Sequence, residues 1–246
     1  MRKHLSVIML ILRSFVYKLL LIMLCMAAAE AAIIFFMPEA KMQLLFDLID
    51  SSRVNFVYIA AAALLMISLL GVCSFGNSHP RYTLARLNVS EKTVMFWHWL
   101  CGALSFLILW LWQIVLLFAI AIWHSGAADP GYVSHQSIYL ATFRSMFFHS
   151  VLPLDDISRF LRNIVIALCM GGSCATGAYK LRRDKKGVFA PTFLIALFAG
   201  TYSAEHFEVS YDGFLMFAFA LVLLISLAGV FTGDAEVDYE EASLEN

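Results

Sequence analysis

A single glutamate interrupts one of the most apolar stretches of this 246-residue chain. Glu30 lies within the run AAAEAAII, and helical spacing places Ala27, Ala31 and Ile34 on the same face as its carboxyl. An ionisable side chain at membrane depth is costly and commonly marks a functional site. Two interpretations stay open. The carboxyl lines a translocation path or gate, or it is protonated or hydrogen-bonded and holds together two helices that the alanines allow to approach closely.

Two further apolar stretches carry small or polar residues at helical spacing. In the stretch 94–123 this stripe consists of His98, Gly102, Ser105, Leu109 and Trp112, with Gln113 beside it. It predicts a face turned toward the bundle or a partner, through packing or through contact with a substrate, and Ser105, Trp112 and Gln113 join Glu30 as candidates for a path or gate. In MGGSCATGA, the residues Gly171, Ala175 and Ala178 predict a close-packing helix face.

Catalytic and cofactor-binding patterns are weak in this sequence. Ser173 and His206 could form a serine–histidine pair, but they are expected at opposite depths of the membrane. No convincing pair of histidines offers axial ligands for haem, and no C-x-x-C spacing indicates a metal site. The stretch GVCSFGNS has glycines but lacks the lysine of a phosphate-binding loop. We therefore expect no catalytic residue, metal or cofactor in this chain, and a membrane enzyme remains an alternative.

Composition identifies the elements that must position these residues. Hydrophobic residues make up 61% of the chain and charged residues 14%, which leaves no room for a large soluble domain. A hydrocarbon core of about 30 Å needs roughly 20 helical residues. Six stretches qualify, of which the fourth is interrupted by Arg162 and Asn163 at its start: 17–37, 54–76, 94–123, 160–179, 188–206 and 212–232. The predicted fold is all-α, with six transmembrane helices.

Lysine and arginine set the orientation. If both termini are cytoplasmic, 12 of the 17 Lys and Arg residues lie on the inner side. Residues 2–14 predict a basic interfacial helix before the first span. We expect one transmembrane domain at 1–233, an acidic disordered cytoplasmic tail at 234–246, and a location in the cell membrane.

Two connections between spans are more than bare loops. The outer segment 124–159 contains an amphipathic stretch, Ile138 to Val151, which could lie on the outer leaflet or cap the bundle as a gate. Asp155 or Asp156 could then cap the following span. On the inner side, SHPRYTLARLNVSEK (78–92) is both basic and apolar. It predicts a short helix over 78–88, after which Ser90 caps the third span. This helix is either interfacial or a docking site for a cytoplasmic partner.

The stretch YTLARLNVSEK, which precedes a long third span rich in tryptophan, resembles the membrane subunits of ABC-2 type transporters of Gram-positive bacteria. In that family the segment between spans 2 and 3 is a coupling helix that seats in the ATPase subunit. The resemblance assigns this role to Arg81, Tyr82, Leu84, Arg86 and Leu87. This chain departs from the better-known exporters of that family at one place. Its segment EHFEVSYDG between spans 5 and 6 is short, whereas those exporters have a sizeable insert there.

The resemblance implies a permease subunit that exports its substrate. The lack of a charged pore lining favours an amphiphile, such as a peptide, an antimicrobial or a lipid-like molecule, over small ions. A separate cytoplasmic ATPase would bind ATP and Mg²⁺, and a second permease subunit, either the same chain or a relative, would complete the pathway in the bilayer. No nucleic-acid partner is expected. The substrate-binding membrane subunit of a vitamin uptake system is a further alternative.

Overall fold

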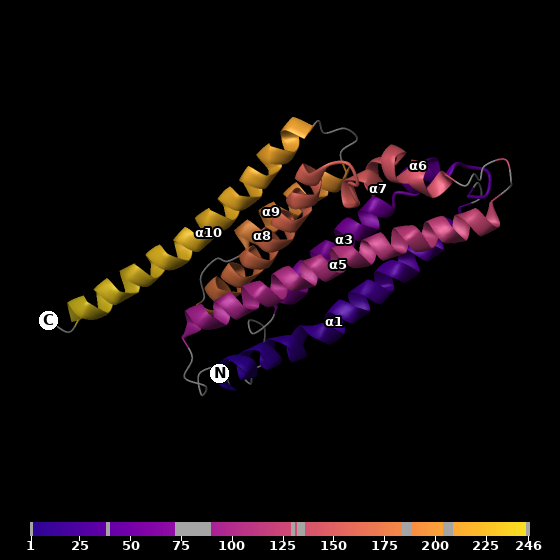
Figure 1. Ribbon diagram of the computed structural model, residues 1–246. Coiled ribbons are helices and arrows are strands. Elements are labelled where there is room, and N and C mark those ends of the chain that lie inside the picture. Colours follow the sequence, from indigo (N-terminus) through magenta and orange to yellow (C-terminus); the bar gives the residue numbers. More distant parts are fainter. Residues whose placement is uncertain are drawn as a thin grey trace.

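The computed structural model describes residues 2–37, 40–71, 90–128, 131, 136–183, 188–203 and 209–244. These residues form an all-helical bundle, and no strand occurs among them. The helices, seen from the side of the bundle in Figure 1, are α1 (Arg2–Phe35), α2 (Leu45–Ser51), α3 (Val54–Leu70), α5 (Glu91–Ala127), α6 (Ser137–Arg144), α7 (Met146–Val151), α8 (Ile157–Arg182), α9 (Phe189–Ser203) and α10 (Val209–Leu244).

Four of these helices, α1, α5, α8 and α10, are long and apolar enough to cross a membrane. The pair α2 and α3 would count as a fifth, bent by 50° at a short break where Arg53 has a left-handed φ of 55°. With 15 residues, α9 covers about 22 Å, less than the hydrocarbon core requires. The described residues thus have the helices of a multi-pass membrane protein, with four or five spans where the sequence predicts six.

The long helices alternate in direction along the bundle. At one end, Arg183 of α8 pairs with Glu91 of α5, and Lys92 lies over the ring of Phe231 near the apolar end of α10. At the other end, Asn55 of α3 donates a hydrogen bond to the carbonyl of Tyr202 on α9. The start of α1 and the end of α10 both lie toward the Glu91 end (Figure 1).

The first helix has no break between the predicted interfacial segment 2–14 and the predicted first span. Its buried side is a single stripe with a spacing of three or four residues: Val7, Ile11, Phe15, Leu19, Ile22, Met26, Glu30 and Ile34. Because this stripe packs on the bundle from its first turns, the structure does not contain a separate N-terminal interfacial helix. Arg13 and Lys18 lie on the exposed side of α1.

The central helix α5 is tied to three neighbours through the indole nitrogens of its tryptophans. Trp99 donates to the carbonyl of Leu168 on α8 (2.9 Å), and Trp110 donates to that of Val151 on α7 (2.9 Å). Trp112 donates to the carbonyl of Met23 on α1 (3.1 Å). Trp110 and Trp112 lie near the middle of α5, so both indoles anchor neighbouring helices along its length and not at its ends.

Helices α5 and α8 approach each other closely at a pair of glycines. A Cβ atom at Gly171 would overlap the backbone nitrogen of Ala103, and one at Gly102 would lie 3.2 Å from the Cα of Gly171. Ala175 and Ala178 continue this face of α8 and are fully buried. Small side chains therefore let the two backbones touch, as in other membrane helix pairs.

The amphipathic stretch 138–151 folds as two short helices and not as one. The chain is extended at Ser145 (ψ 124°), whose hydroxyl caps α7 by accepting from the Phe148 N–H. Asp50 of α2 accepts hydrogen bonds from the Ser145 hydroxyl (2.7 Å) and from the Met146 N–H (3.2 Å). The buried side chains of α7 include Phe148 and Val151, so α7 caps the bundle end.

Two predicted helix caps are confirmed. The Ser90 hydroxyl accepts from the Thr93 N–H at the start of α5, and the Asp156 carboxylate accepts from the Ser158 N–H at the start of α8. At the other end of the chain, α10 continues as a helix to Leu244. This differs from the disorder predicted for 234–246, in a segment without proline that includes the good helix formers alanine, glutamate and leucine.

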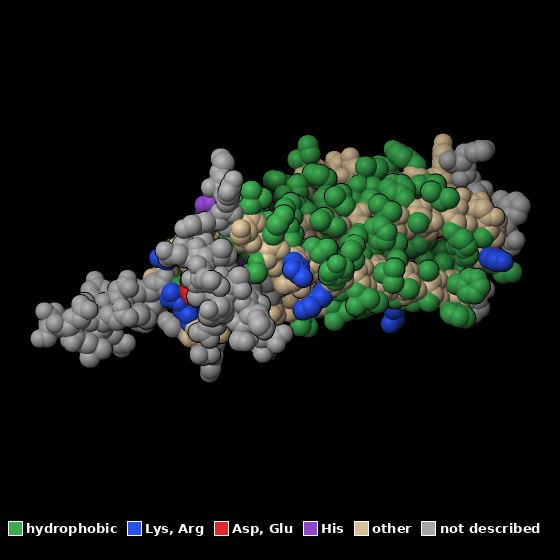
Figure 2. Space-filling model, turned by 90° about the horizontal axis from the view of Figure 1, so that it is seen from below, with side chains coloured by type: hydrophobic (Ala, Val, Ile, Leu, Met, Phe, Trp, Pro, Cys, Tyr) green, Lys and Arg blue, Asp and Glu red, His purple; other side chains and the backbone are tan. Residues whose placement is uncertain are grey.

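The surface of the bundle matches a lipid environment. Figure 2 shows one long face covered mostly by hydrophobic side chains, with relatively few Lys and Arg among them. Large apolar side chains that are more than half exposed include Leu21 on α1, Leu111 on α5 and Phe217 on α10. Such a broad apolar surface is unusual for a soluble monomer.

We predict that Gly171→Ala destabilises the bundle by about 1–3 kcal/mol, because its new methyl group would overlap the backbone of α5. Thermal unfolding of the purified chain in mild detergent measures this change. Gly200→Ala on α9 is the control, since a Cβ there meets nothing within 4 Å. If the two variants unfold at the same temperature, the α5–α8 contact does not have this geometry.

Candidate functional site

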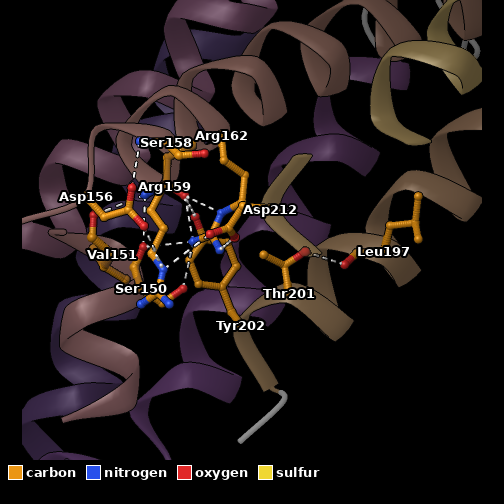
Figure 3. A network of polar contacts seen from close by, with 11 residues as sticks. Ser150, Val151, Asp156, Ser158, Arg159, Arg162, Leu197, Thr201, Tyr202 and Asp212 are labelled. Carbon is orange, nitrogen blue, oxygen red and sulfur yellow. Dashed lines mark hydrogen bonds and ion pairs between the residues drawn. The ribbon is translucent and has the colours of Figure 1, made fainter. Parts of the chain in front are cut away.

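The bundle contains a buried cluster of charged and polar side chains at the end that α7 caps. We call it the Arg162 network, and Figure 3 shows it from close by. Its members are Ser150, Val151, Asp156, Arg159, Arg162, Asn163, Tyr202 and Asp212. Arg162, Asn163 and Asp212 are at most 3% exposed. Because the cluster draws on α7, α8, α9 and α10, it joins four helices at one depth.

Arg162 is the centre of this network. Its Nη1 atom donates to the Oδ1 of Asp212 at 2.6 Å, which forms an ion pair between α8 and α10. Its Nη2 atom donates to both the hydroxyl (2.9 Å) and the carbonyl (3.1 Å) of Ser150 on α7. Nε and Nη2 also lie within 3.4 Å of the amide oxygen of Asn163. The guanidinium thus has hydrogen-bond partners on every nitrogen.

Asn163 extends the network to the neighbouring helices. Its amide nitrogen donates to the Ser150 carbonyl (2.9 Å), and its amide oxygen accepts from the Tyr202 hydroxyl (2.9 Å). The Tyr202 ring packs edge-on against Tyr58 of α3 at a centroid distance of 5.1 Å. The Val151 carbonyl accepts from Trp110 of α5 as well as from Asn163. The network therefore also reaches α3 and α5.

The charges in the network balance. Arg159 lies 3.3 Å from Asp212 and 3.6 Å from Asp156, so two arginines face two aspartates. Breaking one member of a buried ion pair is strongly destabilising, because the other charge remains buried without compensation. The arrangement offers no activated nucleophile. It can instead hold the ends of four helices together, because separating them would expose these charges or leave them without a partner.

The structure places the predicted path residues on α1 and α5, apart from the Arg162 network. Glu30 is 1% exposed, and neither carboxyl oxygen has a hydrogen-bond partner. Gln113 of α5 lies close enough to influence this carboxyl, yet its amide is fully buried and has no hydrogen bond either. Ser105 donates to the Cys101 carbonyl on its own helix, and Trp112 binds α1. Only Glu30 and Gln113 are brought together.

The remaining candidates do not form a reactive site. Ser173 is fully buried and donates to the Met170 carbonyl one turn earlier, which gives it no base. His206 lies outside the described residues. Within the described ranges, no group of three or more His, Cys, Asp or Glu residues could hold a metal ion. The predicted coupling residues, Arg81, Tyr82, Leu84, Arg86 and Leu87, also lie outside the part of the chain that the structure describes.

Sequence reasoning missed the Arg162 network. Arg162 and Asn163 were noted only as an interruption of the fourth apolar stretch, and Asp212 only as the start of the sixth. The signal was an arginine and an aspartate at the same expected end of two neighbouring spans, because buried charges in membranes are usually paired.

Comparison with protein-family models, curated proteins and solved structures gave no match for this chain.

We predict that Asp212→Asn destabilises the folded bundle by about 3–5 kcal/mol, since it leaves the Arg162 guanidinium buried without its carboxylate. Glu91→Gln is the control, because it breaks a pair in which Glu91 is half exposed and is expected to cost at most about 1 kcal/mol. Thermal unfolding in detergent compares the two. Equal shifts would mean that the Arg162–Asp212 pair is hydrated and not enclosed.

Proposed function

We propose that this chain is the transmembrane permease subunit of an ATP-driven transporter of the ABC-2 type. Two permease subunits form the pathway, and a separate cytoplasmic ATPase binds ATP and Mg²⁺. The exported substrate is an amphiphile, such as a peptide, an antimicrobial or a lipid-like molecule. The observation that carries this proposal is the basic and apolar segment 78–92, placed between two membrane-length stretches in a chain without a phosphate-binding loop.

The topology in this proposal has six spans and both termini in the cytoplasm. Its support is the alternation of α1, α3, α5, α8, α9 and α10, which puts the start of α1 and the end of α10 at the same end of the bundle. Segment 78–92 connects α3 to α5 at this end, where Arg183 pairs with Glu91. In this proposal the fifth span is the predicted stretch 188–206, of which α9 is the described helix.

The Arg162 network serves as the outer gate of this transporter in its closed state. Its support is its position at the end opposite Glu91 and its contacts with α7, α8, α9 and α10. Force applied by the ATPase to segment 78–92 reaches α3 and α5 directly, because the segment joins them. Both helices contact the network, α3 through Asn55 and Tyr58 and α5 through Trp110.

The test is capture of the ATPase with the full-length chain from its native membrane in mild detergent. We expect an ATP-binding protein to co-purify, and the Arg86→Glu variant to lose both this partner and the ATPase activity of the complex. Reversing a basic charge in the docking segment places like charges against an acidic seat on the partner. Lys41→Glu is the matched charge reversal at the opposite end of the bundle, and it should retain the partner.

Two results would contradict the proposal. One is a wild-type chain that purifies with no ATP-binding partner under conditions that preserve other membrane complexes. The other is an Arg86→Glu chain that retains its partner and its ATPase activity as fully as Lys41→Glu does.

A further inference from the structure

A cavity of about 490 Å³ lies between α1 and α5, next to the unpartnered carboxyl of Glu30. Its lining from α1 is Ala27, Glu30, Ala31, Ala32, Ile34 and Phe35, and its lining from α5 is Leu116, Ala119, Ile120 and Trp123. On each helix the main lining residues follow the spacing of one face. The volume lies in the range of pockets that bind small molecules.

Alanines make this space. Ala27, Ala31 and Ala119 stand where larger side chains would fill the gap between the helices. Farther toward the start of both helices the gap closes, and Trp112 of α5 donates to the backbone of α1 there. Ala31 and Trp123 are exposed on the lateral, lipid-facing surface, so the cavity is reached from the side of the bundle.

The lining is apolar except for one acidic group. Glu30 is 1% exposed and both its oxygens lack hydrogen bonds, and the Gln113 amide beside it also lacks them. Among the described residues that line the cavity there is no lysine or arginine. On α1 the described basic residues nearest the cavity are Arg13 and Lys18, which lie on its exposed side, and Lys18 is about three helical turns from Glu30. The site thus combines an apolar wall with a buried acceptor that no cation of the lining satisfies.

We propose that this cavity binds an amphiphile with a primary ammonium head and an alkyl body. The ammonium donates to the Glu30 carboxylate, a charge-assisted hydrogen bond, and a further hydrogen bond joins the head to the Gln113 amide oxygen. The alkyl body lies against Ala31, Leu116 and Ile120. The exposed Trp123 ring borders the entrance. This assignment does not depend on transport or on an ATPase partner.

Equilibrium binding of radiolabelled dodecylamine to the full-length chain in lipid nanodiscs tests the proposal, with empty nanodiscs subtracted. Dodecanol is the neutral probe of equal length. We expect Glu30→Gln to weaken dodecylamine binding by about tenfold or more, because it removes the charge and keeps the shape. Dodecanol binding should change by less than about twofold. Ala31→Leu, which fills the cavity, should weaken both probes.

Glu91→Gln is the control variant, because it removes a carboxylate from the surface and should leave both affinities unchanged. If Glu30→Gln binds dodecylamine as tightly as the wild type, or if the wild type binds dodecanol equally well, the proposal is overturned. It is also overturned if Ala31→Cys, in a chain with Cys25 replaced by serine, cross-links into a dimer that dodecylamine does not diminish. That result would assign the face to a second copy. Elution of each variant at the wild-type position verifies folding.

Discussion

Hydrocarbon offers a buried polar group no hydrogen bond, and this constraint governs most of the polar contacts in the bundle. Serine hydroxyls within the long helices donate to carbonyls three or four residues earlier, as Ser105 and Ser173 do. The indole nitrogens of α5 donate to neighbouring helices. The Arg162 guanidinium has partners on three helices. The Glu30 carboxyl and the Gln113 amide beside it are among the exceptions, because both lack a hydrogen bond, and in our interpretation this pair defines a ligand site.

The fold places rigid contacts and open space in different layers. Where α5 meets α8, the glycines bring two backbones into contact and leave no volume for adjustment. Where α5 meets α1, alanines leave a lateral cavity. One helix thus serves as a fixed support on one side and as the wall of an adaptable site on the other. The transporter proposed above would need both properties, since force has to travel through stiff elements while a substrate has to find room.

The sequence predicted the individual helices better than the contacts between them. Apolar length and caps identified the long helices, and the caps at Ser90 and Asp156 are local enough to be recognised from a few residues. The helix break at Ser145 was missed because it depends on Asp50, which is 95 residues away in the chain. The Arg162 network was missed for the same reason, since each member is unremarkable alone. Glu30 was recognised early because its cost in an apolar run is visible without any partner.

The ion pair between α8 and α10 also bears on biosynthesis. Of the four long candidate spans, α8 has the lowest mean hydropathy, 1.4, and it carries Arg162 near its first turn. The carboxylate that neutralises this arginine is made 50 residues later. Because α8 is synthesised before α10, its arginine would enter the bilayer before Asp212 is available to neutralise it. The arrival of α10 would then stabilise α8 in the membrane, and a chain truncated before Asp212 would lack this ion pair.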